Sequence, residues 1–322
     1  MDLIYADDRH RELGVLRGYQ LDLSFGAKEN DFQLKLDASA HCCRAGYLLY
    51  IEGTEYGGVV DSISSDTGTG EVTYMGRTWH GLLNSKVLEP DFAEDYLTVS
   101  GEANAVLRRL VDRLQQGELF RVSGEDSGIQ VQAYRFDRYC KAYDGIRAML
   151  RASGGKLQIR MHRGVVQLSA VPRGDYTASG ELDSDLLPMQ VCRQYEPVNH
   201  LICLGKGELH LRQVLHLYAD AGGTISTSQS LTGARERTEV YDYPNAESAD
   251  ELQQHGRQRL QELRSTDTVK LNLAVQADRF TVGDLVGAVD HVSGLSAQAE
   301  ITQKIVKADA GAITISYELG GT

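Results

Sequence analysis

Short segments in which apolar and polar residues alternate dominate both ends of the chain. Residues 21–25 and 32–36 follow this period of two, and the glycine at 26 and the asparagine at 30 mark a turn between them. Such alternation is typical of strands that bury one face, and short, closely spaced strands are typical of barrels and sandwiches. Further strands are predicted at 48–51, 59–63 and 72–75.

The middle of the chain changes to the spacing of a helix. Apolar residues between 102 and 116 recur every three or four positions, which predicts a helix that packs with one face, and Ser100 is a suitable N-cap. A second helix is predicted over 141–152, where Ser153 and two glycines end it. A hairpin of two strands, 156–161 and 165–171, follows directly. This stretch therefore predicts a small α+β unit.

Strands return in the last third of the chain. They are predicted at 201–204, 210–218, 238–241, 269–275, 285–289, 299–306 and 312–319. Residues 221–230 are small and polar, which predicts a long exposed loop. Ser248, with Glu251 three residues later, forms the capping-box signature of a helix that runs to about residue 264. Few positions of that helix are apolar, so we expect it to be mostly exposed.

These patterns predict an α+β, mostly β protein in which two related small β-barrels flank a small α+β domain. The first barrel covers residues 1–95 and is open to completion by later strands. The α+β insertion covers 96–175, and the second barrel covers 176–322 with the exposed helix near 248–264. An internal echo supports the two barrels, because both ends share the order of glycine-led strand, loop, strand, glycine-containing turn and strand. Ordinary small β-meanders produce a similar echo, and that alternative stays open.

The balance of charge argues against one class of function. The chain has 33 Lys and Arg residues against 45 Asp and Glu residues, a formal net charge of −12. Binding to nucleic acid needs a basic face that displaces counterions from phosphates, so we expect no sequence-specific nucleic-acid binding. Five scattered cysteines fit synthesis in a reducing cytoplasm and not a disulfide framework. No apolar run approaches the roughly 20 residues of a membrane span, and no secretory signal is recognisable.

Candidate catalytic and metal-binding groups are few. Trp79 and His80 beside Arg77 could form an active-site cluster. A simpler explanation is that Trp79 anchors the barrel core and His80 caps the end of the strand. Cys42 and Cys43 are adjacent, so they lack the spacing that lets two sulfurs meet one zinc ion. No phosphate-binding loop and no nucleophile elbow is recognisable.

The acidic residues 91, 94 and 95 could supply the paired carboxylates of a glycoside hydrolase. They follow Pro90 in a polar connector, however, where a solvated run of charges is the simpler explanation. The sequence therefore predicts no catalytic residue, no cofactor site and no metal site, and we expect a protein that is not an enzyme.

Four motifs resemble the hub family of phage tails, which includes baseplate hubs of contractile tails and the N-terminal part of tail-associated proteins of long non-contractile tails. The first joins GGVVDSI at 57–63 to GRTWHGLL at 76–83. Family members similarly have a strand, a turn and a strand that ends in a G-R-S/T-x-x-x-L-L segment. The other motifs are 141–147, 199–208 and 282–286 with the closing hairpin. Their order and spacing over nearly the whole chain carry the resemblance.

The resemblance implies a homotrimer whose paired barrels form a pseudo-hexameric ring at the tail tip or baseplate. Such a ring joins the sixfold tail tube to the threefold tip, and DNA passes through it during ejection. The implied partners are further copies of the chain, a distal tail or tail tube protein, the tape-measure protein, and tip, spike or receptor-binding proteins. The implied location is the tail of a virion, from a phage or prophage, made in the host bacterial cytoplasm. The chain ends at Thr322 soon after the last predicted strand, so the lytic activity of some relatives is not expected.

Two other functions fit less of the sequence. A receptor- or glycan-binding tail accessory module would need clustered exposed aromatic residues, and the chain has a single Trp. A tail-associated cell-wall hydrolase would need catalytic residues that no motif indicates. For contact with a neighbouring tail protein, the candidate is the polar loop after residue 221, with predicted interface residues Gly222, Gly223, Thr224, Ser226 and Ser228. A flexible loop that contacts nothing is the alternative.

Overall fold

The computed structural model describes residues 2–177, 190–192, 198–246, 248–264, 268–270, 278–289, 291–292, 296–309 and 311–321. The chain divides into two compact units, of which the larger contains residues 1–189 and 271–320 and the smaller contains residues 190–270 with the last two residues. Both ends of the sequence therefore contribute to the larger unit. Within the described ranges, no helix is long and apolar enough to cross a membrane.

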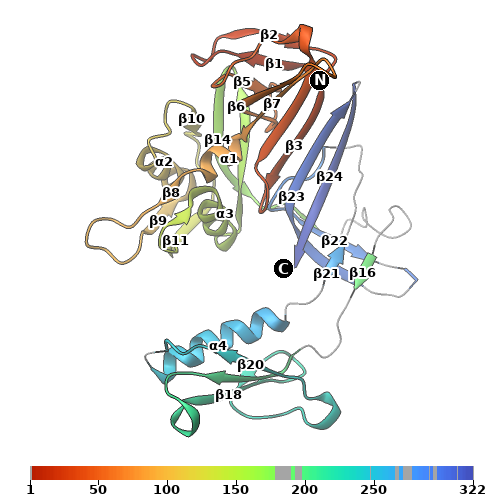
Figure 1. Cartoon of the computed structure of the whole chain (residues 1–322). Coiled ribbons are helices and arrows are strands. Elements are labelled where there is room, and N and C mark those ends of the chain that lie inside the picture. Colours follow the sequence, from red (N-terminus) through yellow and green to blue (C-terminus); the bar gives the residue numbers. More distant parts are fainter. Residues whose placement is uncertain are drawn as a thin grey trace. The chain divides into compact units, whose positions relative to one another are not determined.

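The larger unit is built on an extended sheet (Figure 1). In the described residues it contains eleven strands, in the order β15-β22-β23-β3-β4-β7-β6-β5-β1-β2 with β24 beside β23. The N-terminal strands are β1 (Leu3–Ala6), β2 (Glu12–Leu16), β3 (Gln20–Gly26), β4 (Asp31–Asp37), β5 (Leu48–Tyr50), β6 (Gly57–Asp66) and β7 (Glu71–Thr78). The later strands are β15 (Asp175–Tyr176), β22 (Leu285–Val289), β23 (Ser296–Asp309) and β24 (Ala312–Gly321).

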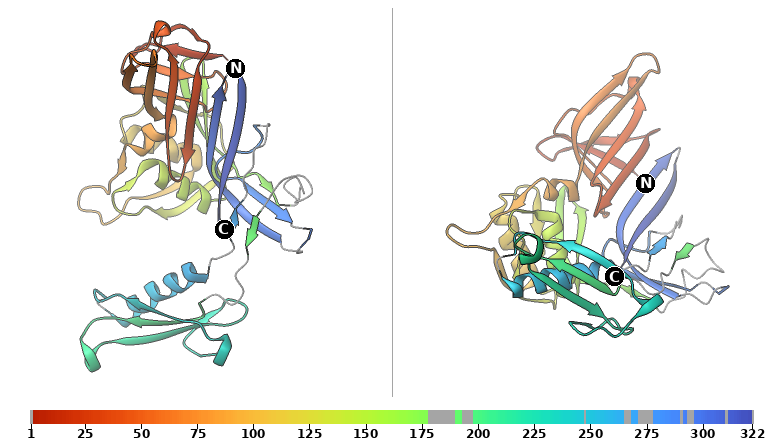
Figure 2. Two further views of the ribbon diagram at one scale, coloured as in Figure 1. Left: turned by 45° about the vertical axis from the view of Figure 1, so that its right-hand side comes forward. Right: turned by 60° about the horizontal axis from the view of Figure 1, so that its bottom comes forward.

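Strands from opposite ends of the chain pair directly in this sheet. β23 runs antiparallel to β3, from Gln303 opposite Gly26 to Asp309 opposite Gln20. The views of Figures 1 and 2 agree in showing β3, β23 and β24 side by side. Alternate residues of β3, such as Leu21 and Leu23, are buried, as the period-two pattern predicts. The N-terminal and C-terminal β regions are thus joined through backbone hydrogen bonds.

Helices and smaller sheets pack against the N-terminal strands. The helices are α1 (Trp79–Asn84), α2 (Ala103–Arg113) and α3 (Ala142–Ala152). One small sheet holds β10 (Phe120–Val122), β14 (Val165–Pro172) and β13 (Gly155–His162), and two strand pairs join β9 (Thr98–Glu102) with β11 (Gln130–Arg135) and β8 (Val87–Leu88) with β12 (Cys140–Lys141). One core contains the apolar faces of α2 and α3 together with Trp79. The predicted helices and hairpin are confirmed, but Glu102, and not Ser100, caps α2, because its carboxylate reaches the free N–H groups of the first turn.

The smaller unit is a four-stranded sheet covered on one face by a helix. The strand order is β19 (Ile225–Ser226), β18 (Val214–Ala219), β17 (His200–Leu204) and β20 (Thr238–Asp242), and the helix is α4 (Ala249–Arg264). Leu252 and Leu260 of α4 belong to one core with Leu201 and Leu217. A separate pair joins β16 (Gln190–Cys192) with β21 (Thr268–Lys270).

Two predicted strands differ from the structure. The strand predicted at 210–218 begins only at Val214, because Leu209–Leu211 form a 3-10 turn. Most of the strand predicted at 269–275 lies outside the described residues. Two further 3-10 turns span Ala38–Ala40 and Gly233–Arg235. The α+β, mostly β fold class is confirmed, whereas the two related barrels and the boundaries after residues 95 and 175 stay predictions.

Candidate functional site

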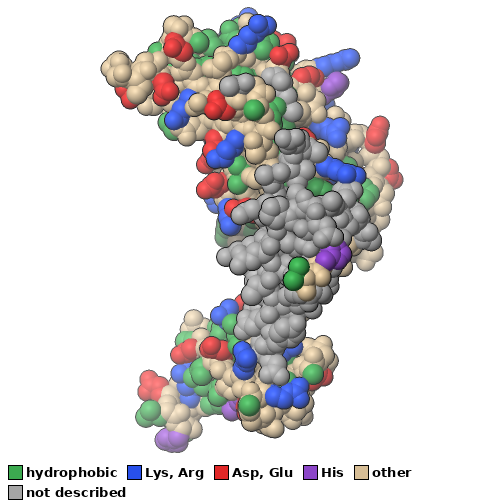
Figure 3. All heavy atoms as spheres, turned by 90° about the vertical axis from the view of Figure 1, so that its right-hand side faces the viewer, with side chains coloured by type: hydrophobic (Ala, Val, Ile, Leu, Met, Phe, Trp, Pro, Cys, Tyr) green, Lys and Arg blue, Asp and Glu red, His purple; other side chains and the backbone are tan. Residues whose placement is uncertain are grey.

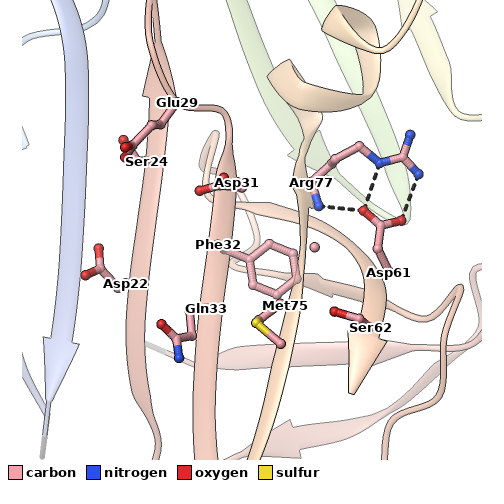
Figure 4. Close-up of a pocket in the computed structure, with 11 residues that line it drawn as sticks. Asp22, Ser24, Glu29, Asp31, Phe32, Gln33, Asp61, Ser62, Met75 and Arg77 are labelled. Atoms are coloured by element: carbon pink, nitrogen blue, oxygen red, sulfur yellow. Dashed lines mark hydrogen bonds and ion pairs between the residues drawn. The ribbon is translucent and has the colours of Figure 1, made fainter. Parts of the chain in front are cut away.

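A polar groove of about 480 Å³ lies on one face of the large sheet, where β3, β4, β7 and β6 run side by side (Figure 4). Its lining contains more acidic than basic side chains. The residues that line it are Asp22, Ser24, Glu29, Asp31, Phe32, Gln33, Asp61, Ser62, Met75, Gly76 and Arg77. On the surface shown in Figure 3, by contrast, acidic and basic side chains of the described residues are interspersed.

The strand register assembles the floor of this groove. Asp22 is opposite Gln33, Gln33 is opposite Met75, and Met75 is opposite Ser62, so one side chain from each of four strands forms a continuous row. Cross-strand neighbours of this kind lie about 5 Å apart on one face of a sheet. The alternation that buries the leucines of β3 and β4 on the other face therefore brings this polar row together.

A β-bulge shapes the wall of the groove formed by β6. The register between β6 and β7 shifts between Val60 and Ser62, which leaves Asp61 as the extra residue. Opposite the bulge stands Gly76, where a Cβ atom would lie only 1.9 Å from the carbonyl oxygen of Val59. Only glycine allows the two backbones to approach this closely, so Gly76 is required by the bulge.

Asp61 and Arg77 form a bidentate ion pair at this bulge (Figure 4). Oδ2 of Asp61 accepts from the backbone N–H of Arg77 at 3.0 Å and from Nε at 2.8 Å, and Oδ1 accepts from Nη2 at 2.7 Å. The side-chain hydrogen bonds that Arg77 donates to Asp61 lower the pKa of Asp61. The same hydrogen bonds raise the pKa of Arg77. Both side chains are partly exposed, so the pair adds little stability. It fixes the geometry of the bulge and keeps this carboxylate ionised.

The outer edge of β6 borders the groove and has no strand partner among the described residues. β5 pairs only with Gly57–Val59 of β6, whereas residues 61–66 are bonded to β7 alone and are all exposed. Ile63 stands opposite Tyr74, which is completely buried, yet Ile63 itself remains 39% exposed. A free strand edge with an exposed apolar side chain is a surface to which another chain can pair.

The predicted interface residues lie together in the smaller unit. Gly222, Gly223 and Thr224 form the turn between β18 and β19, where Asp220 accepts the N–H of Thr224 through its side chain at 2.8 Å. Ser226 ends β19, and its hydroxyl accepts from the N–H of Ser228 at 3.2 Å. The structure brings these five residues into one surface segment, and their role in an interface stays a prediction.

The other groups considered in the sequence do not form a reactive cluster. Trp79 and His80 are buried at the start of α1, and burial lowers the pKa of His80 to about 3, so this imidazole is neutral. Asp91 accepts from Nη1 of Arg113 at 2.7 Å. Within the described ranges, no group of three or more His, Cys, Asp or Glu side chains could hold a metal ion.

The sequence motifs contained the key residues of the groove without indicating their arrangement. Asp61, Gly76 and Arg77 all lie in the GGVVDSI and GRTWHGLL segments. A bulge shifts the register by one residue and cannot be found from alternation alone. The available signal was a glycine inside a strand, which often marks a bulge or a close backbone contact.

The fold resembles solved phage tail proteins over the full length of the chain. Prophage tail protein gp18 from Listeria monocytogenes EGD-e has a TM-score of 0.52 and 15% identity, with 100% of this chain and 95% of that protein covered. The tail protein from Neisseria meningitidis MC58 has a TM-score of 0.52 and 12% identity, with coverage of 99% and 96%. The 43 kDa tail protein of prophage MuSo2 from Shewanella oneidensis has a TM-score of 0.57 and 12% identity, with coverage of 99% and 98%.

These identities are low, so the likeness establishes the fold. No protein-family model matches the chain, and no curated protein matches its sequence. The chain has the fold of prophage tail proteins, which confirms at the level of the fold the resemblance carried by the four sequence motifs.

Proposed function

We propose that this chain, whose fold is that of prophage tail proteins, is a structural subunit at the tip or baseplate of a phage-type tail. The observation that carries the proposal is the extent of the likeness, which spans 99–100% of this chain. It also spans 95–98% of the three solved tail proteins. Agreement over whole chains supports a shared architectural role better than a match of one domain does. Because one fold can serve several functions, the proposal calls for a test of assembly.

Three copies form the working unit in this proposal, a pseudo-hexameric ring that joins the tail tube to the threefold tip and lets DNA pass. Its other partners are the tube or distal tail protein, the tape-measure protein and the tip, spike or receptor-binding proteins. The ring is supported by two similar hairpins that the chain carries in one sheet, β6–β7 near its beginning and β23–β24 at its end. Three copies with two such hairpins each would give the ring an approximate sixfold symmetry. A head-to-tail contact with a suitable rotation closes into a ring.

The proposed role is structural and not enzymatic. The carboxylate in the groove with the best-defined surroundings, that of Asp61, is held ionised by Arg77 and is not poised to exchange a proton near neutral pH. His80, a residue type that often acts as a general base, is enclosed and neutral. These observations support recognition of another surface more than catalysis.

Light scattering after size exclusion, at two protein concentrations, tests the proposal. A mass three times the 35.5 kDa of one chain, with rings of approximate sixfold symmetry in electron micrographs, is the expected result. A single-chain mass at both concentrations would contradict the self-closing ring and favour a receptor- or glycan-binding accessory. Release of soluble fragments from peptidoglycan by the purified protein would contradict the absence of enzymatic activity.

A further inference from the structure

We propose that the free edge of β6, over residues 61–66, pairs with a β-strand from the C-terminal β region of a second copy of this chain. The large sheet of one copy then continues into the next. This inference rests on the proposed ring and identifies the surface through which its subunits join.

The edge is built to accept a strand. Residues 61–66 are exposed and bonded to β7 on one side, and within the described part of the chain no strand lies on the other side. Exposed edges are usually protected by lysine, proline, inward-pointing charge or a β-bulge, and here the bulge at Asp61 lies at the start of the segment and leaves residues 62–66 in regular register with β7. This segment, DSISSD, has no lysine and no proline, its Asp61 is engaged by Arg77, and three serines leave room for a close backbone approach.

Ile63 gives the edge its apolar contact. The side chain of its cross-strand neighbour Tyr74 is buried in the core of the sheet, so Ile63 points to the same face. It remains 39% exposed because the sheet ends beside it. A strand added to β6 would extend the core past Ile63 and cover it, and burial of such a side chain contributes about 1–2 kcal/mol.

The other end of the chain shows how the same kind of edge is satisfied. β23 is the first strand of the hairpin β23–β24, as β6 is the first strand of β6–β7, and the two hairpins share their sequence order. The edge of β23 that faces away from β24 is paired with β3, a strand of the N-terminal region. The corresponding edge of β6 is the free one.

The joint between β3 and β23 also shows that such contacts are specific. At Gly26, where β3 ends, a Cβ atom would lie 2.2 Å from the carbonyl oxygen of Thr302. The side chain of Gln303 donates to the carbonyl of Glu29 at 2.7 Å and accepts from the N–H of Lys28 at 2.9 Å. Within one chain, a C-terminal hairpin thus receives an N-terminal strand.

A second copy is the occupant that this pattern favours. The free edge lies in the N-terminal β region, so the reciprocal contact takes a strand from a C-terminal β region, which each further copy supplies. Donor and acceptor are different surfaces, so the contact is head-to-tail, and it closes into the proposed ring when the rotation between copies is suitable. A foreign strand would satisfy the edge without explaining why its counterpart on β23 is filled from within the chain.

Two matched substitutions test the inference. Ile63→Lys places a charge at the edge of β6, and Val15→Lys places one on β2, a different edge strand that ends the sheet beyond β5 and β1, where Val15 is 45% exposed. We expect I63K to raise the concentration at which trimers form by at least about tenfold, and V15K to leave it unchanged. Because both side chains are partly exposed, neither variant should lose its fold, which circular dichroism of the monomer checks.

Hydrogen–deuterium exchange provides a readout that does not depend on a variant. A peptide covering residues 61–66 of the wild-type protein should exchange more slowly in the trimer than in the I63K monomer. The inference is overturned if I63K forms trimers at the same concentration as the wild type, or if this peptide is unprotected in the wild-type trimer. Either result leaves the proposed function standing. The inference is also overturned if V15K weakens the trimer as much as I63K does. A wild-type protein that is monomeric at every concentration overturns the ring itself.

Discussion

Nε2 of Gln303 donates a hydrogen bond to Oγ of Ser24 at 2.6 Å, and both side chains are buried although 279 residues separate them in the sequence. The same amide group also bonds to the backbone at Lys28 and Glu29. One polar side chain from the C-terminal β region is therefore fully paired inside the N-terminal one. Buried polar groups that are satisfied in this way fix a unique geometry, because any shift leaves a donor or acceptor unpaired.

Replacement of Gln303 by Leu should destabilise the larger unit by about 1–3 kcal/mol, because it leaves the N–H of Lys28 and the hydroxyl of Ser24 without this partner. Urea denaturation followed by tryptophan fluorescence measures the change, since Trp79 is the single tryptophan and lies in this unit. Gln33→Leu, at an exposed position of β4, is the control and should change the free energy of unfolding by less than about 0.5 kcal/mol. Equal effects of the two variants would contradict the assigned role of Gln303.

Lys304→Met should have a larger effect. The ammonium group of Lys304 is completely buried, 2.9 Å from Oε1 of Glu55 and 2.5 Å from Oδ1 of Asp278. Burial alone would lower the pKa of Lys304, but the neighbouring Glu55, Tyr56 and Asp278 outweigh it and raise the pKa. Without the lysine, Glu55 is a largely buried carboxylate that has lost its cation, which costs about 3–5 kcal/mol.

The matched control for Lys304 is Lys307→Met on the same strand. Lys307 is exposed and pairs with Asp22 at 2.8 Å, so its loss should cost less than about 1 kcal/mol. Thermal unfolding of both variants checks the contrast. A K304M protein as stable as K307M would show that the buried lysine contributes no more than a surface pair does.

Gly76→Ala tests the bulge that forms the groove. The added methyl group would lie 1.9 Å from the carbonyl oxygen of Val59, so β6 and β7 must separate. We expect a loss of about 3 kcal/mol or more in the free energy of unfolding, at the upper end of overpacking effects. Gly117→Ala, where no atom lies within 4 Å of the new Cβ, should be neutral or slightly stabilising. A G76A protein of wild-type stability would mean that the bulge is adaptable.

Local patterns predicted the strands, and long-range contacts decided how they join. The alternation around Leu21 and Leu34 correctly indicated buried faces, and the apolar stripe around Leu107 correctly indicated α2. The pairing of β23 with β3 joins residues almost a full chain length apart, and periodicity carries no information about which strands become neighbours. The fold class could therefore be predicted, whereas the joint could not.

The candidate site shows the same division. Asp61 and Arg77 stood in motifs that the family resemblance brought out, but nothing in their spacing of sixteen residues shows that they touch. Their contact depends on a bulge, which displaces the register by one residue. Composition predicted the exposed loop after residue 221, because small polar residues favour turns. It did not indicate the short strand β19 (Ile225–Ser226), which pairs with β18 inside that segment. Composition could not indicate the free edge of β6, because an edge depends on which strands pair in three dimensions, and among the described residues none pairs with this side of residues 61–66.

The acidic cap of α2 gives a dependence of stability on pH. The carboxylate of Glu102 accepts hydrogen bonds from the N–H groups of Asn104 and Ala105 and from the N–H and hydroxyl of Ser127. Partial burial works against ionisation, but these hydrogen bonds outweigh it and lower the pKa of Glu102 to about 2. Because the pKa is lower in the folded than in the unfolded protein, this stabilisation is complete above about pH 4.3 and is lost as the pH falls toward 2.

Glu102→Gln should therefore cost about 1 kcal/mol at pH 7, a typical value for a helix cap, and progressively less below pH 4. Urea denaturation of the wild type and the variant at pH 7, 5, 4 and 3 measures the difference in the free energy of unfolding. Glu118→Gln, at an exposed position after the same helix, is the control and should show no such convergence. A difference between wild type and E102Q that stays constant from pH 7 to pH 3 would show that the cap acts through its shape and not through the charge of its carboxylate.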